Sequence, residues 1–278
     1  MNETQTSETL ERLRQFLRQY ESALVAYSGG VDSAVVLAVA GQVLGSRVLA
    51  CIGVSASYPR RERVAAVELA RQLGVAIRIV ETTEQEDPNY TANPANRCYY
   101  CKSRLYADLA ALARQEHYAV VLDGNNASDQ TDDRPGGRAG REHGVVSPLA
   151  ALGITKPLVR LLARHLGLDV WDKPATPCLS SRVPHGVPIV PGLLERIEQA
   201  EDTLVALGFT EFRVRHHGEL ARVELPEKDL PRALELRGPI VAGIERAGYK
   251  FVTLDLTGFC SGKLHALSAR GHSVRGAG

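Results

Sequence analysis

The stretch ALVAYSGGVDSAVVLAVA, residues 23–40, decides the fold. A continuous apolar run ends at Tyr27, the chain turns through a serine and two glycines, and a second apolar segment starts after Ser33. An unbroken apolar run of this kind is typical of a strand that is buried on both faces of a parallel sheet. The stretch therefore predicts a buried strand, a tight glycine turn and a helix over residues 32–44.

The same strand–helix pattern is repeated along much of the chain. Strands that alternate with helices favour a doubly wound, mostly parallel α/β sheet with helices on both of its faces. We expect strands at 23–27, 47–55, 76–82 and 119–124, and helices at 8–20, 32–44, 59–73, 97–116 and 155–166.

The pattern changes from about residue 187 onward. We expect a helix at 191–207, strands at 211–217 and 219–225, a helical segment at 227–247 and a closing strand at 249–256. This order is typical of a small α+β domain. The segment PCLSSRVPHGVP contains three prolines and marks the junction, so the predicted domains are 1–183 and 184–278.

Composition narrows the class of protein. The chain has 278 residues, of which 44% are hydrophobic, so it can bury a sizeable core. Its net charge of +1 weighs against a stable nucleic-acid partner. The N-terminus lacks the apolar region of a signal peptide, and no stretch of about 18 apolar residues predicts a membrane span. We therefore expect a cytoplasmic protein, in which its five cysteines act as core residues, metal ligands or reactive thiols.

The glycine turn is suited to binding an anion. In an open parallel sheet, ligands bind outside the carboxyl ends of the strands. A helix that starts there offers free N–H groups and the positive end of its dipole, and Gly29 and Gly30 allow an anion to approach closely. Ser28 and Ser33 supply hydroxyls, and Asp32 can hold a Mg²⁺ ion that bridges phosphates. The alternative is an ordinary tight turn between strand and helix.

Neither a Walker P-loop nor a dinucleotide fingerprint is present in the sequence. The hexapeptide SGGVDS after a buried strand instead resembles the PP-loop of the ATP pyrophosphatase superfamily. Members of that superfamily transfer AMP from ATP to an oxygen of the substrate and release pyrophosphate. The resemblance implies that the pyrophosphate is cradled by Ser28, Gly29, Gly30, Val31, Asp32 and Ser33.

Further nucleotide-binding candidates lie outside the glycine turn. The segment DGNNASD, residues 123–129, resembles the second loop of that superfamily, which makes Asp123 and Gly124 candidates for ATP binding. Lys102 and Arg134 could supply positive charge to the phosphates. The alternative for these two basic residues is a solvated surface position.

The cysteines suggest a sulfur site. Cys98 and Cys101 form a C-x-x-C at a predicted helix start, where they can share a metal or form a redox pair. A second C-x-x-C is missing, which disfavours a zinc ribbon. Cys178 lies in the proline-rich loop, which could return to the same edge of the sheet; the alternative is a buried loop residue. Three thiolates suit a [4Fe-4S] cluster with one open iron. Cys51 is expected in the core, and Cys260 in a structural role.

The motifs SGGVDS, NRCYYCKSRLY, DGNNASD, DDRPG, PCLSSRVPHG, FRVRHH and FVTLDLTGFCSG follow one another in this order. As an ordered set, from about residue 8 to 265, they resemble the LarE family of the PP-loop superfamily. The resemblance implies an adenine nucleotide alpha hydrolase-like PP-loop domain. It also implies an enzyme that adenylylates a carboxylate of pyridinium-3,5-biscarboxylic acid mononucleotide and converts it to a thiocarboxylate. The product serves the nickel-pincer nucleotide cofactor of lactate racemase and related enzymes.

Two sulfur mechanisms occur in the family. Some members sacrifice the sulfur of a cysteine, whereas others use a [4Fe-4S] cluster. The three-cysteine pattern favours the cluster type, with Cys98, Cys101 and Cys178 as ligands, Cys178 and Asp32 as catalytic residues, and ATP and Mg²⁺ as cofactors. A sacrificial Cys178 is the alternative. The family usually carries a basic residue where this chain has Cys260.

Substrate-binding candidates follow from charge. Arg213 and Arg215 alternate along one strand, so both can face one anion, unless they form a solvated strand face. Ser181 and Arg182 lie close to Cys178 in the sequence, and the resemblance supports all four as ligands of a small-molecule nucleotide. It also implies a homo-oligomer, such as a hexamer, formed through the small domain. The sequence does not identify the sulfur donor.

Two rival functions stay open. A PP-loop tRNA thiolase can also hold a three-cysteine cluster, but the near-neutral charge disfavours it. A non-enzymatic nucleotide-binding regulator would leave the clustered cysteines without a purpose.

Overall fold

The computed structural model describes residues 3–129 and 135–259. Contacts divide the chain into two compact units, Met1–Cys178 and Leu179–Gly278, which are called unit 1 and unit 2 below. The division falls inside the proline-rich segment that the sequence marks as a junction. No helix in the described ranges is both long enough and apolar enough to cross a membrane.

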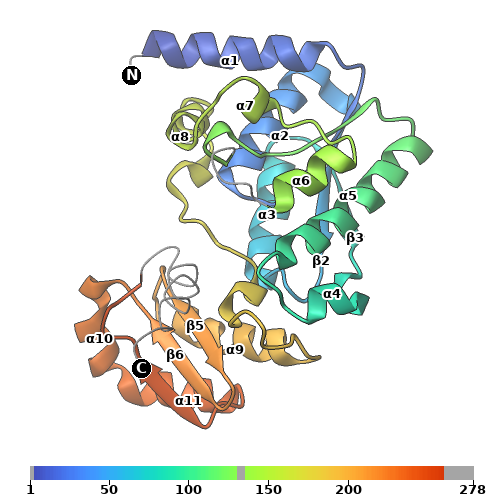
Figure 1. Ribbon diagram of the computed structural model, residues 1–278. Coiled ribbons are helices and arrows are strands. Elements are labelled where there is room, and N and C mark those ends of the chain that lie inside the picture. The colour runs from blue at the N-terminus through green and yellow to red at the C-terminus, as the bar shows by residue number, and fades with distance from the viewer. Residues whose placement is uncertain (1–2, 130–134, 260–278) are drawn as a thin grey trace, which may run out of the picture. The chain divides into compact units, whose positions relative to one another are not determined.

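Unit 1 is built on a four-stranded sheet with the order β3-β2-β1-β4 (Figure 1). Every neighbouring pair in it is parallel, and Val25 of β1 is in register with Ala50 of β2 and Leu122 of β4. This confirms the α/β fold predicted from the alternating pattern. The strands are β1 (Ala23–Ala26), β2 (Val48–Val54), β3 (Ala76–Glu81) and β4 (Val120–Leu122).

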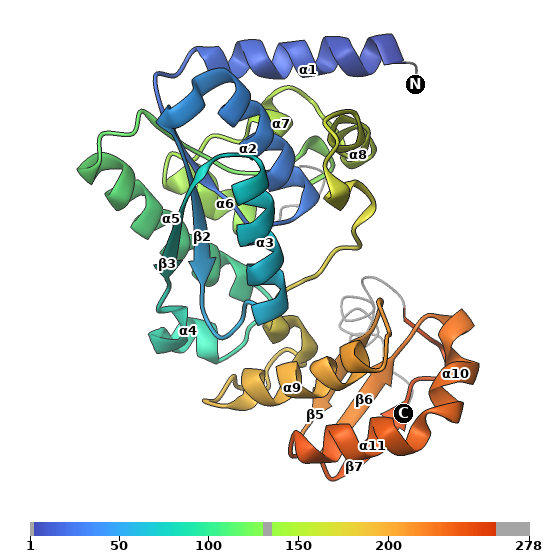
Figure 2. The same ribbon diagram turned by 180° about the vertical axis from the view of Figure 1, so that it is seen from behind.

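Strand side chains of unit 1 alternate between two cores. Val25 and Ile52 point into the core formed with the first set of helices, whereas Leu24 and Cys51 point into the core on the other face. Both faces are thus apolar, which explains the unbroken apolar runs in the sequence. Figure 2 shows α2 and α3 on one side of β2 and α5 on the other. The first set is α1 (Glu3–Arg18), α2 (Val31–Leu44), α3 (Arg60–Gln72) and α8 (Lys156–His165), and the second is α5 (Arg97–Gln115) and α6 (Pro135–Glu142).

Three short helices were not expected from the sequence: α4 (Pro88–Thr91), α6 and α7 (Pro148–Ala151). The sequence of α6, PGGRAGRE, contains three glycines, which disfavour a helix by propensity. Packing supplies the missing stability, because Ala139 is buried and Glu142 accepts a hydrogen bond from the Tyr99 hydroxyl of α5 at 2.6 Å. Glu142 also pairs with Arg138 one turn earlier.

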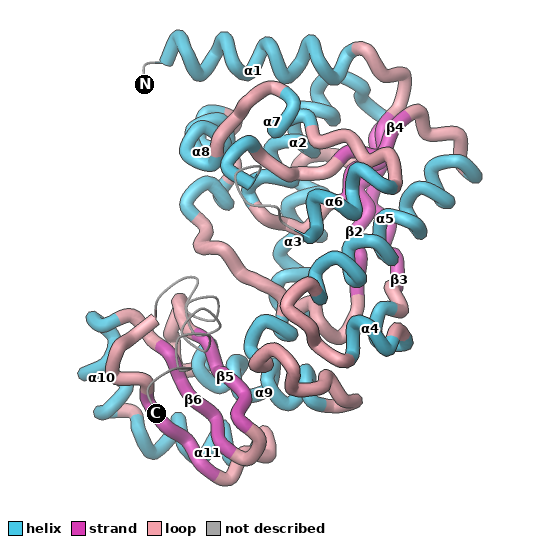
Figure 3. The backbone as a smooth tube through the Cα atoms, in the orientation of Figure 1, coloured by secondary structure: helices cyan, strands magenta, loops and turns pink. Residues whose placement is uncertain are grey.

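Unit 2 contains a three-stranded mixed sheet with the order β5-β6-β7 (Figure 3). The first two strands are antiparallel, and β7 is parallel to β6. The predicted helical segment 227–247 is divided into two helices. Pro239 explains the break, because its ring would clash with the carbonyl of Glu235 in a continuous helix. The elements are α9 (Leu193–Ala206), β5 (Arg213–His217), β6 (Leu220–Glu224), α10 (Leu230–Glu235), α11 (Arg237–Arg246) and β7 (Phe251–Leu254).

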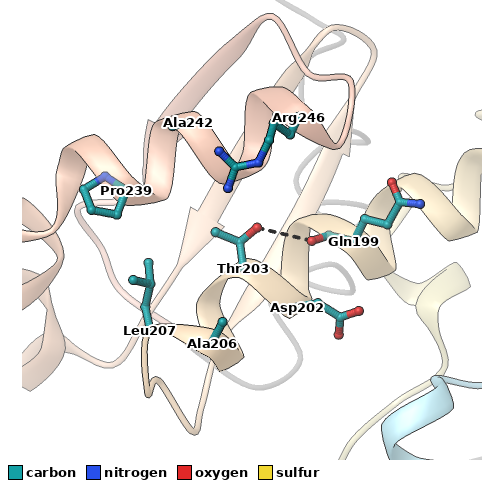
Figure 4. Close-up of a pocket in the computed structure, with 8 residues that line it drawn as sticks. All are labelled: Gln199, Asp202, Thr203, Ala206, Leu207, Pro239, Ala242 and Arg246. Carbon is teal, nitrogen blue, oxygen red and sulfur yellow. Dashed lines mark hydrogen bonds between the residues drawn. The ribbon is translucent and has the colours of Figure 1, made fainter.

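Helices α9 and α11 approach each other closely at Gly243. A Cβ atom there would lie 2.2 Å from Cγ2 of Thr203, so only glycine fits. An open hollow of about 540 Å³ flanks this contact (Figure 4). Its charged side chains are Asp202 and Arg246, and none of the predicted site residues lines it.

Candidate active site

Ser28 and Ser33 close the glycine turn into a compact loop. The Ser28 N–H donates to Oγ of Ser33 at 3.2 Å, and the two hydroxyl oxygens lie 3.1 Å apart. Oγ of Ser33 in turn donates to the Gly30 carbonyl at 3.1 Å. Gly30 is the N-cap of α2 and provides no side-chain cap for the helix. The first-turn N–H groups of α2 thus have no capping side chain, which suits them to bind phosphate oxygens.

Two glycines allow the backbone to pack tightly around this loop. Gly29 has a φ of +68°, and a Cβ atom there would lie 2.6 Å from Cβ of Ala66. A Cβ atom on Gly124 would lie 2.6 Å from the backbone nitrogen of Ser33. The structure therefore places the 123–129 loop directly against the first turn of α2. These two segments are far apart in the sequence, and the second-loop motif gave the signal for their meeting.

Asp32 is held by two side chains from later in the chain. The Asn126 amide donates to its Oδ1 at 3.1 Å, and Lys156 forms an ion pair with its Oδ2. Lys156 is the first residue of α8, and its own N–H donates to Oγ of Ser128 at 3.1 Å. Sequence reasoning missed this lysine. A lysine at a helix N-terminus opposes the helix dipole, and this was the one available signal.

A buried hydrogen-bond chain connects Asp123 to Lys102. Asp123 accepts bonds from the Tyr106 hydroxyl at 2.8 Å and the Ser147 hydroxyl at 2.6 Å, and the Lys102 amine donates to Tyr106 at 3.1 Å. Burial by itself would lower the pKa of Lys102, but Tyr106 and Asp123 raise it overall. Lys102 therefore stays charged next to the cysteines. The carboxylate of Asp123 thus accepts hydrogen bonds from within the protein, including one from the backbone N–H of Asn125.

The structure brings the three predicted cysteines into one region of unit 1. Cys98 and Cys101 lie in the first turns of α5, and the charge of a Cys178 thiolate acts on the pKa of both. Desolvation raises the pKa of Cys98 and Cys101, and a charged Cys178 would raise it further. No disulfide joins them in this structure, and the redox-pair alternative stays a prediction. Within residues 3–129 and 135–259, no three His, Cys, Asp or Glu side chains are grouped closely enough to hold a metal ion.

Two buried charges that sequence reasoning missed flank the cysteines. Arg97 favours the thiolate of Cys98 and donates to Oδ1 of Asn93. Glu84 is 1% exposed, accepts hydrogen bonds from the hydroxyls of Ser55 and Ser57, and raises the pKa of Cys101. Arg97 directly precedes Cys98 in the sequence, whereas nothing in the sequence marks Glu84. Cys51 is buried in the sheet core, as expected, and burial raises its pKa to about 12.

Two of the predicted substrate arginines of unit 2, Arg182 and Arg215, are buried and paired with carboxylates. Arg182 is 0% exposed and binds both carboxylate oxygens of Glu201, at 2.8 and 3.0 Å. Arg215 pairs with Glu224 at 2.9 Å and donates to the Ser181 carbonyl at 2.9 Å. Arg182 thus joins its own segment to α9 through an internal ion pair.

Arg213 and Arg215 lie on the same face of β5, as the alternation predicts. Both are buried, so the alternative of a solvated strand face is wrong. The guanidinium of Arg213 stacks on the ring of Phe259 at 4.9 Å. Arg222 lies opposite Arg215 across the strand pair and shares Glu224 with it. The predicted residues Arg134 and Cys260 lie outside the described residues.

Comparison with known proteins adds the family to this geometry. Residues 13–129 match the model of the asparagine synthase family. The chain is 36% identical, over 250 residues, to the pyridinium-3,5-bisthiocarboxylic acid mononucleotide synthase of Lactiplantibacillus plantarum, covering 90% of this chain and 91% of that protein. The chain belongs to the LarE family. It is thus a PP-loop ATP pyrophosphatase and a homologue of an ATP-dependent sulfur-inserting enzyme.

Two further relatives are informative about how far the likeness extends. The uncharacterized protein slr1717 of Synechocystis is 46% identical over 258 residues, which cover 92% of this chain and 96% of that protein. A component of the glutamine-hydrolysing GMP synthase of Methanopyrus kandleri is 27% identical over 173 residues, covering 58% of this chain and 54% of that protein. The similarity to the LarE-family synthase therefore extends over both units, whereas the similarity to the GMP synthase component covers 58% of the chain.

Proposed function

We propose that this protein uses ATP to convert a carboxylate of pyridinium-3,5-biscarboxylic acid mononucleotide into a thiocarboxylate for the nickel-pincer nucleotide cofactor. The proposal is supported most by one observation in unit 1. The uncapped PP-loop helix α2 follows β1, Cys98 and Cys101 lie at the start of α5, and Cys178 lies in the segment after α8, all in unit 1. That combination provides a place for ATP and a place for sulfur on one scaffold.

In this proposal, the PP-loop and two lysines, Lys102 and Lys156, bind and activate ATP. Phosphate oxygens bind the N–H groups and hydroxyls between Ser28 and Ser33. Asp32 would hold the Mg²⁺ ion, which would supply positive charge to the phosphates, and Lys156, which pairs with Asp32 in this structure, would be a second cation available to them. The substrate carboxylate attacks the α-phosphate, the bond between the α- and β-phosphates breaks, and pyrophosphate leaves. Lys102, kept charged by its buried partners, adds positive charge for the phosphates.

In this proposal, the three cysteines deliver the sulfur. Three thiolates suit a [4Fe-4S] cluster, and Cys98, Cys101 and Cys178 are the proposed ligands. They lie in one unit, but in this structure they are not grouped closely enough to hold a metal ion, so the cluster would have to draw them together. Such a cluster would supply an open iron position for a sulfur atom. The protein contributes the thiolates, the cation of Arg97 and a partly desolvated setting. Nucleophilic sulfur attacks the adenylylated carboxyl carbon, and AMP leaves.

Substrate anions are proposed to bind unit 2. Arg213 and Arg215 offer guanidinium groups on one face of β5, with Ser181 beside Arg215. Arg182 supports that face by holding Glu201, which accepts the Val214 N–H at 3.2 Å. We also infer a homo-oligomer, such as a hexamer, formed through unit 2, and native mass spectrometry would count its chains.

The test is a reaction under oxygen-free conditions with Mg-ATP, the pyridinium nucleotide and sulfide. We expect AMP, pyrophosphate and a product in which sulfur replaces one carboxylate oxygen, followed by mass spectrometry. Cys178→Ser should abolish the thiocarboxylate, whereas Cys51→Ala, which removes a thiol of the sheet core, should preserve it. Iron and acid-labile sulfide in the purified protein would support the cluster. Loss of sulfur from Cys178 after one turnover would show the sacrificial route instead.

The same assay separates the rival functions. Formation of AMP only with tRNA would identify a tRNA thiolase, and that binding would weaken steeply with salt. Binding of ATP without pyrophosphate release would identify a regulator. Either result would overturn the proposal.

A further inference from the structure

Arg97 is a buried cation that is held by an amide and precedes Cys98 in the sequence. It is 4% exposed, and its guanidinium donates to the amide oxygen of Asn93. Arg97 directly precedes Cys98 in the first turn of α5, and its charge lowers the pKa of that thiol against the larger, opposite effect of desolvation. Among the residues that the structure describes, no carboxylate lies within ion-pair distance of it. A buried charge is costly unless an opposite charge accompanies it.

Two other buried arginines of the chain follow that rule. Arg182 binds Glu201 and Arg215 binds Glu224, each in a carboxylate pair. Arg97 differs because both of its neighbours are neutral groups when the thiol is protonated. Asn93, which holds the guanidinium, is itself fully buried and has a φ of +54°, a left-handed conformation that asparagine adopts more readily than most residues other than glycine. The loop is therefore shaped to hold Arg97 at the start of α5.

The surroundings of Arg97 add further positive charge. Cys98 lies in the first turn of the 19-residue helix α5, whose N-cap Asn96 makes no side-chain cap, so the positive end of the helix dipole faces this region. Lys102 favours the thiolates of both Cys98 and Cys101. Opposing them is Glu84, whose charge acts on Cys101 and whose Oε1 is bound by Ser55 and Ser57. The cationic groups thus act most strongly at Cys98.

We propose that Arg97 is the counter-ion of the cysteine site and makes it selective for anions, so that sulfur enters as an anionic inorganic species such as hydrosulfide. Arg97 is a positioning residue in this scheme. It offsets the negative charge that collects when thiolates and a sulfur anion are brought together. The identity of the anion rests on the proposed function, but the anion selectivity does not.

The test compares two alkylating reagents of nearly the same shape. Iodoacetate is an anion and iodoacetamide is neutral, and both react with a thiolate. The ratio of their rates at Cys98 therefore cancels the thiolate fraction and isolates the attraction for negative charge. We would measure that ratio by peptide mass spectrometry on the full chain after removal of iron, which requires neither ATP nor substrate.

Three variants separate charge from structure. Arg97→Gln should lower the iodoacetate-to-iodoacetamide ratio about tenfold, the effect of two unit charges about 6 Å apart in an effective dielectric of about 40. Arg97→Lys keeps the charge and should keep the ratio. Arg104→Gln removes an exposed charge that pairs with Asp108 on the same helix, and should leave the ratio unchanged.

The outcomes are decisive in either direction. An unchanged ratio in Arg97→Gln would overturn the proposal. An equal fall in Arg97→Gln and Arg97→Lys would also overturn it, because Arg97 would then merely hold the loop in shape. In the sulfur-transfer assay, Arg97→Gln should raise the KM for sulfide about tenfold with a smaller change in kcat. If the proposed reaction does not occur at all, the alkylation ratio still decides the anion selectivity.

Discussion

Arg97 in unit 1 and Arg182 in unit 2 are both buried arginines, but their neighbours differ. Arg182 is locked to both carboxylate oxygens of Glu201, whereas Arg97 is held by an amide and precedes Cys98 in the sequence. Unit 2 has thus neutralised this buried charge internally. In unit 1, among its described residues, Arg97 has no carboxylate within ion-pair distance, although Glu84 also lies near the cysteines, and the start of α2 has no side-chain cap. The ion pairs of Arg182 and Arg215 are thus part of the fold of unit 2, whereas Arg97 of unit 1 has no such pair among the described residues.

The largest expected effect tests the ion pair of unit 2. Arg182→Ala leaves Glu201 buried without its arginine, so we expect a loss of about 3–5 kcal/mol in the free energy of unfolding of that unit. Hydrogen exchange of the α9 and β5 peptides in urea would measure it. The double variant Arg182→Met, Glu201→Leu should recover a large part of the loss. Fluorescence of Trp171, which lies in unit 1, provides the internal control. Normal stability of Arg182→Ala would contradict the comparison.

The next effect concerns the contact between the 123–129 loop and α2. Gly124→Ala places a Cβ atom 2.6 Å from the Ser33 nitrogen, so the backbone must move. Overpacking of this kind costs about 1–3 kcal/mol, and ATP affinity should fall with it. Equilibrium binding of ATP and thermal unfolding would measure the two effects. Gly137→Ala is the control, since its nearest neighbour would be 3.8 Å away, and it should bind ATP normally.

A smaller effect is expected from the lysine that holds Asp32. Lys156→Gln removes a cation that is available to the phosphates, so the KM for Mg-ATP in pyrophosphate release should rise about tenfold, or about 1.4 kcal/mol. Lys173→Gln removes a lysine that pairs with Glu62, also in unit 1, and serves as the control. Equal effects of the two substitutions would show that Lys156 acts only as a structural cation.

The smallest effect is the pH dependence of unit 2. Burial lowers the pKa of His216, whose ring nitrogen lies 3.2 Å from the Tyr249 hydroxyl. The unfolded chain binds a proton there near the ordinary pKa of about 6.5, and the folded chain binds it only at lower pH. Stability is therefore unaffected above that pKa and falls as the pH drops below it.

Urea unfolding of unit 2 at pH 7.5 and pH 5.5 would show this loss, and His216→Gln should reduce it. His165→Gln in α8 of unit 1 is the matched control. A pH dependence that is the same in both variants would assign it to other groups.

Much of the fold could be read from the sequence because its signals are local. Apolar runs in 23–27 and 47–55 predict strands that both cores bury, and the structure contains β1 and β2 there. Helix α6 could not be read in this way. Its three glycines argue against a helix, and contacts with Tyr99 and the buried position of Ala139 overrule them.

The sequence by itself determined the parallel α/β sheet, the glycine turn that opens α2, and the candidate cysteines. Each depends on neighbouring residues or on a short spacing, which fixes periodicity and turn chemistry. Only the tertiary structure decided which charges meet. Lys156 pairs with an aspartate 124 residues away, and Arg182 with a glutamate 19 residues away. It also left Arg97 buried with no carboxylate beside it among the described residues. Such pairings depend on which loops the fold brings together, and no local pattern encodes that.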